Sequence, residues 1–313
     1  MRRFLAGCSL AILASACAAA TIDASRVALY DLGSVEDALV TVGERGSILR
    51  SLDQGRSWQS TVAVTDRSLT ALAFVDGTHG VAVGHGGTVL RTADAGVTWT
   101  KVEVRDAGTD SLLGITALHD GRFIAYGAFG LYLESADRGV TWVRKRAVAE
   151  DFDRHISKVI EAGDKLLLVG ESATVAISAD GGASWKALKS PYEGSLFGAL
   201  LMRDGAWLIY GMRGNVYRSA DAGATWKKVE FPATVAINGG SVSPDGRVVL
   251  VGNNGVVGTS RDDGKSFVAD NVPQRVPLAQ ASYARDGALV YVGYLSSGRK
   301  EGQAPSHLTA PKQ

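Results

Sequence analysis

Residues 80–99 read Gly-Val-Ala-Val-Gly-His-Gly-Gly-Thr-Val-Leu-Arg-Thr-Ala-Asp-Ala-Gly-Val-Thr-Trp. The stretch holds two short apolar runs separated by a glycine-rich turn. It ends in the motif Ser/Thr-x-Asp-x-Gly-x-Ser/Thr-Trp, from Thr92 to Trp99. Short apolar runs rich in β-branched residues, separated by glycine turns, predict antiparallel hairpins.

This motif recurs along the chain at a nearly constant spacing of 41 or 43 residues. Its aspartates are Asp53, Asp94, Asp137, Asp180, Asp221 and Asp262, and its closing aromatic residues are Trp58, Trp99, Trp142, Trp185, Trp226 and, in the sixth copy, Phe267. A glycine that ends a β-rich run recurs seven times with the same spacing, at Gly43, Gly84, Gly127, Gly170, Gly211, Gly252 and Gly293. Seven units of about four short strands each predict an all-β, seven-bladed β-propeller of four-stranded antiparallel blades.

The last unit departs from the pattern, because residues 297–313 contain no aspartate motif. We expect a terminal segment to complete this blade, since an unpaired strand edge is a template for aggregation. Two segments are candidates: Thr21–Arg26 near the N-terminus, and the polar tail around His307, Leu308 and Thr309.

The first twenty residues have the layout of a secretory signal peptide: a basic start at Arg2 and Arg3, an apolar stretch, and then small residues. We therefore expect residues 21–313 to form one exported, periplasmic propeller with a short polar C-terminal tail. A lipoprotein is the alternative, because Leu13–Cys17 resembles a lipobox in which Cys17 is lipidated. Both cysteines lie in this leader, so the exported domain has no disulfide.

Composition narrows the function. The chain carries 33 Lys+Arg against 32 Asp+Glu, a formal net charge of +1, which gives no reason to expect a nucleic-acid partner. The five histidines show no spacing typical of metal ligands, and no glycine loop opens a helix to hold phosphate. We expect neither a metal nor a cofactor.

The recurring aspartate is predicted to be structural. An Asp can accept hydrogen bonds from backbone N–H groups of its own turn, while the Gly of the motif takes a left-handed conformation. The Trp ring can then pack against a neighbouring blade. A catalytic or metal site needs unlike residues converging at one point, whereas this motif is the same in every unit.

These motifs resemble Asp boxes, and the chain is similar to the BNR/Asp-box propellers, most closely to the photosystem II stability/assembly factor family. The resemblance covers residues 26–295. It implies a seven-bladed exported propeller that assists assembly of a membrane complex by binding its partners. Relatives in non-photosynthetic bacteria include some that occur alongside RND-type exporters, so the implied client is an envelope or membrane protein and such an exporter is one candidate.

Function is expected on the face that holds the hairpins between the second and third strands and the links between blades, because equivalent positions there differ in residue type. Arginines and aromatic residues dominate protein interfaces. The candidate partner-binding residues are Arg45, Arg67, His85, Phe129, Arg154, Tyr192, Arg213, Asn253, Arg275 and Tyr294.

Two other functions remain open. Sialidases also carry Asp boxes on propellers, and this chain has the carboxylates Glu44, Asp151, Asp153, Glu171 and Glu193, but it lacks the Arg-Ile-Pro string that precedes the first box of a sialidase. A carbohydrate-binding propeller without turnover would stack sugar rings on Phe129 and Tyr294. We favour a non-catalytic binding or assembly factor.

Overall fold

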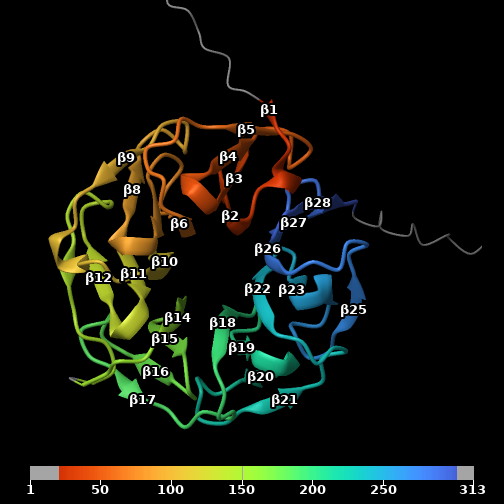
Figure 1. The fold of residues 1–313 in the computed structure, drawn as a ribbon. Helices are drawn as coiled ribbons and strands as arrows, with labels where there is room; N and C mark the ends of the chain where they lie inside the picture. Colours follow the sequence, from red (N-terminus) through yellow and green to blue (C-terminus); the bar gives the residue numbers. More distant parts are fainter. Residues whose placement is uncertain (1–20, 150, 302–313) are drawn as a thin grey trace, which may run out of the picture.

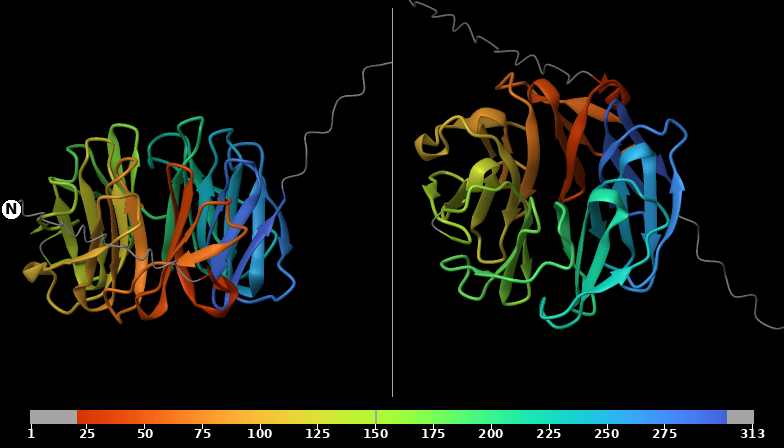
Figure 2. Two further views of the ribbon diagram at one scale, coloured as in Figure 1. Left: turned by 90° about the horizontal axis from the view of Figure 1, so that it is seen from above. Right: turned by 60° about the horizontal axis from the view of Figure 1, so that its bottom comes forward.

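The computed structural model describes residues 21–149 and 151–301, which form a ring of seven blades around a central channel (Figure 1). Seen from the side, the ring is a flat disc with loops on both faces (Figure 2). No helix within the described ranges is long and apolar enough to cross a membrane. The predicted seven-bladed propeller is confirmed. The signal peptide predicted at residues 1–20, with Cys17, falls outside the described residues.

The first six blades each have four antiparallel strands ordered from the channel outward. The first blade contains β2 (Leu29–Val35), β3 (Ala38–Gly43), β4 (Ile48–Ser51) and β5 (Trp58–Ser60), and the second contains β6 (Leu69–Phe74), β7 (Gly80–Gly84), β8 (Val89–Thr92) and β9 (Thr100–Val102). The third contains β10 (Leu112–Ala117), β11 (Phe123–Gly127), β12 (Tyr132–Ser135) and β13 (Val143–Arg144), and the fourth contains β14 (Ile156–Ala162), β15 (Lys165–Gly170), β16 (Val175–Ser178) and β17 (Lys186–Ala187). The fifth contains β18 (Leu196–Leu201), β19 (Trp207–Gly211), β20 (Val216–Ser219) and β21 (Lys227–Val229), and the sixth contains β22 (Ile237–Val242), β23 (Val248–Gly252), β24 (Val256–Ser260) and β25 (Val268–Asn271).

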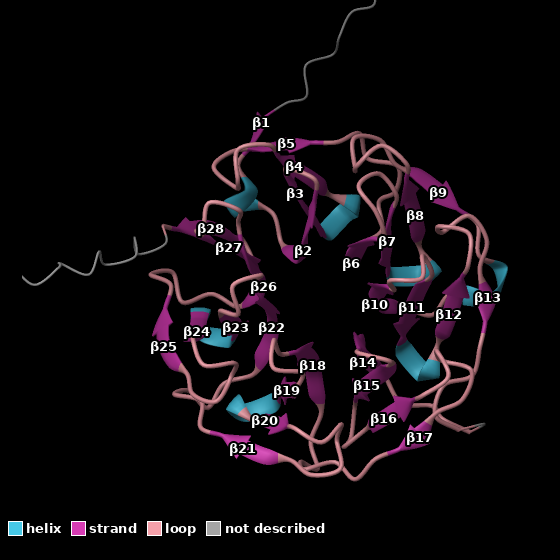
Figure 3. Cartoon of the chain, turned by 180° about the vertical axis from the view of Figure 1, so that it is seen from behind, coloured by secondary structure: helices cyan, strands magenta, loops and turns pink. Residues whose placement is uncertain are grey.

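Short 3-10 turns are the helical elements of the described chain, and most join the second and third strands of a blade (Figure 3). They are η1 (Ala24–Arg26), η2 (Glu44–Gly46), η3 (His85–Gly87), η4 (Arg105–Ala107), η5 (Ala128–Gly130), η6 (Met212–Gly214) and η7 (Asn253–Gly255).

The seventh blade has three strands, β26 (Leu278–Tyr283), β27 (Leu289–Gly293) and β28 (Ser296–Lys300). The expectation that residues 21–26 add a fourth strand to it is wrong. Instead, β1 (Thr21–Ile22) pairs with β5 and becomes a fifth strand on the outer edge of the first blade. Immediately after β1, η1 turns the chain and lies against β28. The alternative tail at His307–Thr309 lies outside the described residues.

Side-chain contacts close the ring where strand pairing does not. In several blades an arginine donates to a carbonyl in the aspartate turn of the next blade: Arg50 to Ala95 (3.2 Å), Arg91 to Arg138 (2.8 Å), Arg218 to Asp263 (3.0 Å) and Arg299 to Gln54 (3.1 Å). The last of these joins the seventh blade to the first. The Arg299 side chain is 8% exposed and also pairs with Asp286 at 2.7 Å.

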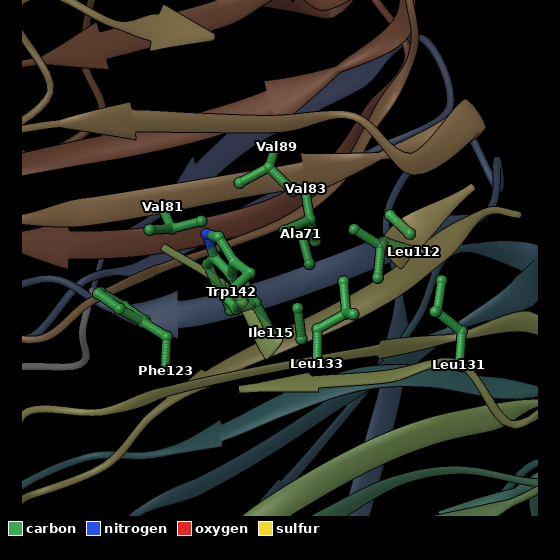
Figure 4. Close-up of a cluster of buried hydrophobic side chains, with 12 residues drawn as sticks. Ala71, Val81, Val83, Val89, Leu112, Ile115, Phe123, Leu131, Leu133 and Trp142 are labelled. Carbon is green, nitrogen blue, oxygen red and sulfur yellow. The ribbon is translucent and has the colours of Figure 1, made fainter. Parts of the chain in front are cut away.

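The core lies between blades rather than in one centre. Trp142 of the third blade packs with Val81 and Val83 of the second and with Phe123 of its own blade (Figure 4). Its Nε1 donates to the carbonyl of Gly139 at 3.2 Å, so the ring is anchored at its polar end. The closing aromatic residues of the other motifs pack against the preceding blade in the same way.

Candidate functional site

The two faces of the disc are built differently. Each 3-10 turn between the second and third strands is bonded to the link that enters its blade; the amide of His85, for example, donates to the carbonyl of Ser68 at 3.0 Å. These turns and links form what we call the hairpin face. The turns between first and second strands and the aspartate turns form the opposite face, which we call the aspartate face. This assignment agrees with the one predicted from strand connectivity.

The aspartate turn is a closed hydrogen-bonding unit. In the second blade, Oδ1 of Asp94 accepts from the Thr92 hydroxyl (2.8 Å) and from the Thr98 amide (2.9 Å), while Oδ2 accepts from the Thr98 hydroxyl (2.6 Å). Gly96 has a φ of +79° and donates its amide to Oγ1 of Thr92 at 3.0 Å. The equivalent bonds form at the other five aspartates.

These hydrogen bonds set the ionisation of the aspartates. The Ser184 hydroxyl is the main cause that lowers the pKa of Asp180 to about 2, and the Thr225 hydroxyl lowers the pKa of Asp221 to about 2 in the same way. A carboxyl with such a pKa is ionised at neutral pH and serves as an acceptor. The carboxylate of the motif therefore stabilises its turn by accepting hydrogen bonds, and at neutral pH it has no proton to donate as a general acid.

The hairpin face presents several side chains from strained backbone. The middle residue of the 3-10 turn has a left-handed φ at Arg45 (52°), Phe129 (52°), Arg213 (57°) and Asn254 (59°), where the second blade has Gly86. Such a conformation costs roughly 1–2 kcal/mol for a residue with a Cβ, and strained residues cluster at binding sites. All four of these side chains are exposed, and Phe129 is 59% exposed.

The five candidate arginines all lie on the hairpin face and are exposed. Arg154 donates from Nη1 to the carbonyl of Ser172 at 2.8 Å. In the described part of the chain, no carboxylate lies within 4.0 Å of the guanidinium groups of Arg45, Arg67, Arg213 and Arg275. These four cations are therefore available to an anionic group from outside.

A groove lies on this face at the mouth of the central channel. It measures about 380 Å³ and is lined mainly by Tyr30, His85, Asn238, Pro277 and Tyr294. Tyr294 is 56% exposed and Tyr30 is 38% exposed, so both rings are open to a ligand. The groove is thus an apolar depression on the same face as the four arginines without a carboxylate partner.

Polar contacts fix the walls of the groove. Nδ1 of His85 lies 2.9 Å from the Ser111 hydroxyl. Nδ2 of Asn238 donates to Oδ1 of Asn253 at 3.0 Å and to the carbonyl of Leu278 at 2.8 Å. Of the predicted residues, His85 and Tyr294 line the groove, and Asn253 supports its wall.

Tyr30 and Asn238 were not predicted. Both are the second residue of an inner strand, and this position varies between blades: Tyr30, Thr70, Leu113, Ser157, Phe197, Asn238 and Ala279. Variation at equivalent repeat positions was the criterion that selected the hairpin tips. Applied to the inner strands, the same criterion would have found them.

Two further candidates are partly engaged in packing. The rings of Phe129 and His155 meet edge to face, with centroids 5.1 Å apart. Tyr192 is half-buried and stacks on Tyr217 at 6.5 Å. Phe129 therefore keeps an open surface, whereas Tyr192 mainly covers the side of its blade.

Two of the five carboxylates considered for glycoside hydrolysis accept backbone hydrogen bonds. Oε1 of Glu44 accepts from the amide of Ala28 at 3.1 Å, and Oε2 of Glu171 accepts from the amide of His155 at 3.2 Å. These two residues occupy the same turn position in the first and fourth blades. Across residues 21–149 and 151–301, no three His, Cys, Asp or Glu side chains are grouped so as to hold a metal ion.

Comparison with known proteins supports the fold. The profile of the DUF6242 beta propeller domain matches residues 140–286. No curated protein matches the sequence. Among solved structures, YCF48 bound to D1 peptide is similar with a TM-score of 0.70 and 18% identity, covering 89% of this chain and 93% of that one.

Two other solved structures show how widely the fold is shared. YCF48 from Cyanidioschyzon merolae has a TM-score of 0.69 and 13% identity, covering 88% of this chain and 95% of that one. An ancestral GH74 enzyme has a TM-score of 0.72 and 14% identity, covering 91% of this chain and 46% of that one. At these identities the likeness establishes the propeller fold alone.

Proposed function

We propose that the protein is a non-catalytic propeller that binds an extended segment of another protein on its hairpin face. The observation that carries this proposal is the groove of Tyr30, His85 and Tyr294 at the channel mouth, on the same face as four arginines that have no carboxylate partner in the described chain. Aromatic residues and arginines contribute most of the free energy at protein interfaces.

The chemistry of the surface defines the segment it fits. The groove takes one apolar side chain, since its exposed lining is mostly carbon. Arg45 lies at the hairpin tip of the first blade, which lines the groove, and Arg213 lies at that of the fifth blade, farther around the same face. Carboxylates of an extended segment that crosses this face would therefore meet guanidinium groups. An acidic segment with a central apolar residue is therefore the partner we propose.

Similarity supports the same class of function. One solved relative of this fold is YCF48 bound to D1 peptide, a propeller with a bound segment of another protein. By analogy we propose that this chain assists the assembly or operation of an envelope or membrane protein complex, with an RND-type exporter as one candidate client. We propose a periplasmic location from the signal-peptide pattern of residues 1–20, with lipidation of Cys17 as the alternative.

The roles of Glu44 and Glu171 in the structure argue against the hydrolase alternative. Glu44 and Glu171 each accept a backbone hydrogen bond within their own blade, and these blades are not adjacent. A glycosidase needs two carboxyl groups that flank one bond, roughly 5–9.5 Å apart. We expect no turnover of aryl glycosides, and no change when Glu44→Gln and Glu171→Gln are made together.

Charge reversal tests the binding proposal. Arg45→Glu combined with Arg213→Glu should abolish co-purification of the partner after crosslinking in the cells that make the protein. The matched control is Arg138→Glu with Arg261→Glu, two exposed arginines on the aspartate face that give the same change in net charge. Equal capture by both double variants would refute the proposal.

A further inference from the structure

A second site lies deeper in the molecule, inside the central channel. The inner strands enclose a cavity of about 350 Å³ that shares Tyr30, Thr70, Asn238 and Ala279 with the groove at its mouth. A ligand on the hairpin face therefore has a path into the channel. The volume falls in the range of small-molecule sites.

Three side chains of adjacent blades converge in this cavity. Lys158 stands on β14 of the fourth blade, while Tyr126 on β11 and Tyr210 on β19 belong to the blades on either side. Lys158 interacts with both phenols, and its pKa is raised to about 12, first by Tyr126, against the opposing effect of burial. The ammonium group is therefore charged at neutral pH.

Glycines make this convergence possible. A Cβ on Gly114 would lie 2.2 Å from the Tyr126 ring, and a Cβ on Gly198 would lie 2.2 Å from the Tyr210 ring. Each tyrosine of a second strand thus passes over a glycine of the first strand to reach the channel. No side chain other than glycine leaves that space, so the same local device is built twice, once on each side of Lys158.

The hydrogen-bonding capacity of this cluster is not used up by the protein. Between described residues no hydrogen bond uses the Tyr210 hydroxyl, and its oxygen is not among the fully buried polar atoms, so it faces the open space of the cavity. The Lys158 ammonium has three donors, and no carboxylate of the described chain lies within 4.0 Å of it. These donors therefore remain open to an acceptor that enters the cavity.

Another part of the cavity wall presents a hydrogen-bond acceptor instead of donors. Asp31 on β2 accepts amide hydrogen bonds from Leu32 and Leu72, both at 2.9 Å, and is close enough to Lys158 to raise its pKa. Each carboxylate oxygen accepts two hydrogen bonds, so capacity remains. Gln280 from β26 lies beside Asp31, with Nε2 at 3.5 Å from Oδ1.

We propose that the channel binds a small carboxylate that carries a hydroxyl or ammonium group next to its carboxyl carbon, the class of α-hydroxy and α-amino acids. The carboxylate accepts hydrogen bonds from Lys158, Tyr126 and Tyr210, and the neighbouring donor faces Asp31. Charged hydrogen bonds in a partly dehydrated channel favour such a ligand over water. The cavity adjoins the groove, but the four residues proposed to contact this ligand line the cavity and not the groove.

Ligand-observed NMR titration of the purified protein with glycolate, glycine and acetate tests the proposal. Glycolate and glycine should bind more tightly than acetate, which lacks the second group. Lys158→Met should weaken binding of all three about tenfold or more, and Tyr210→Phe about two- to tenfold. Lys165→Met, in the same blade on the aspartate face, should change nothing.

Tyr210→Phe removes only one oxygen atom, so we expect this variant to fold. It tests the proposed site even if Lys158→Met does not fold. Saturable binding that is weakened in Tyr210→Phe and in Lys158→Met, and unchanged in Lys165→Met, supports the site. No saturable binding of any of the three acids, or the same affinity in Tyr210→Phe and the unaltered protein, overturns it. Neither result bears on the capture of a protein partner by the hairpin face.

Discussion

Gly84, the last residue of β7, lies against the carbonyl of Ser68, and a Cβ built on Gly84 would sit 2.1 Å from that oxygen. The same approach occurs at the end of the second strand in all seven blades, at distances of 2.0–2.3 Å. The backbone there is extended, with φ of −168° at Gly84, so close contact rather than a left-handed conformation requires glycine.

Gly84→Ala should therefore lower the free energy of unfolding by about 2–4 kcal/mol, because a backbone carbonyl cannot move aside without disturbing the turn. Gly33→Ala is the control. Its Cβ would meet only the flexible Leu72 side chain at 2.9 Å, so we expect a smaller loss. Urea unfolding of both variants measures the difference, and equal losses would contradict this explanation.

Trp142 should contribute more than any polar contact at the junction of the second and third blades. Trp142→Ala leaves a cavity beside Val81 and Val83, and the expected loss is about 3–5 kcal/mol. Trp142→Phe should cost less, since Phe267 occupies the equivalent position in the sixth blade. Thermal unfolding of the two variants orders the losses, and a larger loss for Phe than for Ala would be inconsistent with this packing.

The aspartate turns should make the protein sensitive to acid. The pKa of Asp180 is depressed to about 2 in the folded state, below an unfolded value of about 3.9. The stability that this carboxylate contributes is present above pH ~3.9 and is lost as the pH falls through about 2. Asp180→Asn should lower the urea midpoint at pH 7, and the difference from the unaltered protein should vanish near pH 2.

Asp66→Asn is the matched control, because Asp66 is an exposed carboxylate on a blade link outside the aspartate turns. Its urea midpoint should stay near that of the unaltered protein at both pH values. A difference for Asp180→Asn that persists at pH 2 would show that the carboxylate charge is not what stabilises the turn.

Arg299 should hold the seventh blade to the first. Its replacement by Met removes the bond to the Gln54 carbonyl and leaves Asp286 with the Ala288 amide at 3.2 Å and, as its remaining cation among the described residues, Arg56 at 3.3 Å. We expect a loss of about 1–3 kcal/mol and faster hydrogen exchange in β28 and β2. Arg91→Met should instead accelerate exchange at the junction of the second and third blades. Uniform acceleration around the ring in both variants would contradict a local role.

Much of this architecture is readable from the sequence because each blade repeats the same local chemistry. The aspartates and glycines recur at positions where one residue type is required by the local geometry, as at Asp94 and Gly84. The repeat shows this requirement six times for the aspartate and seven times for the glycine. The ring closure has no such signal. The seventh unit lacks the aspartate motif, and β1 is a two-residue strand too short to show periodicity.

The side-chain cluster in the channel could not be predicted from the sequence, for a related reason. Each of three inner strands has one of these residues at its third position: Asp31 in β2, Lys158 in β14 and Gln280 in β26. Whole blades separate them in the sequence, so no local pattern links them. Only the closed ring brings them to one cavity. The hairpin tips were easier to select, because tip residues such as Arg45 and Arg213 follow a glycine landmark.

Site-specific photo-crosslinking tests the central proposal, capture of a protein segment by the hairpin face, most directly. A photoreactive phenylalanine analogue at Tyr294, in the groove, should give one discrete adduct with an envelope or membrane protein in the cells that make this chain. The same analogue at Val97, exposed on the aspartate face, should not give it. The adduct should disappear when Arg45→Glu and Arg213→Glu are added. Adducts that are the same from both positions, or that survive the charge reversal, would contradict the account.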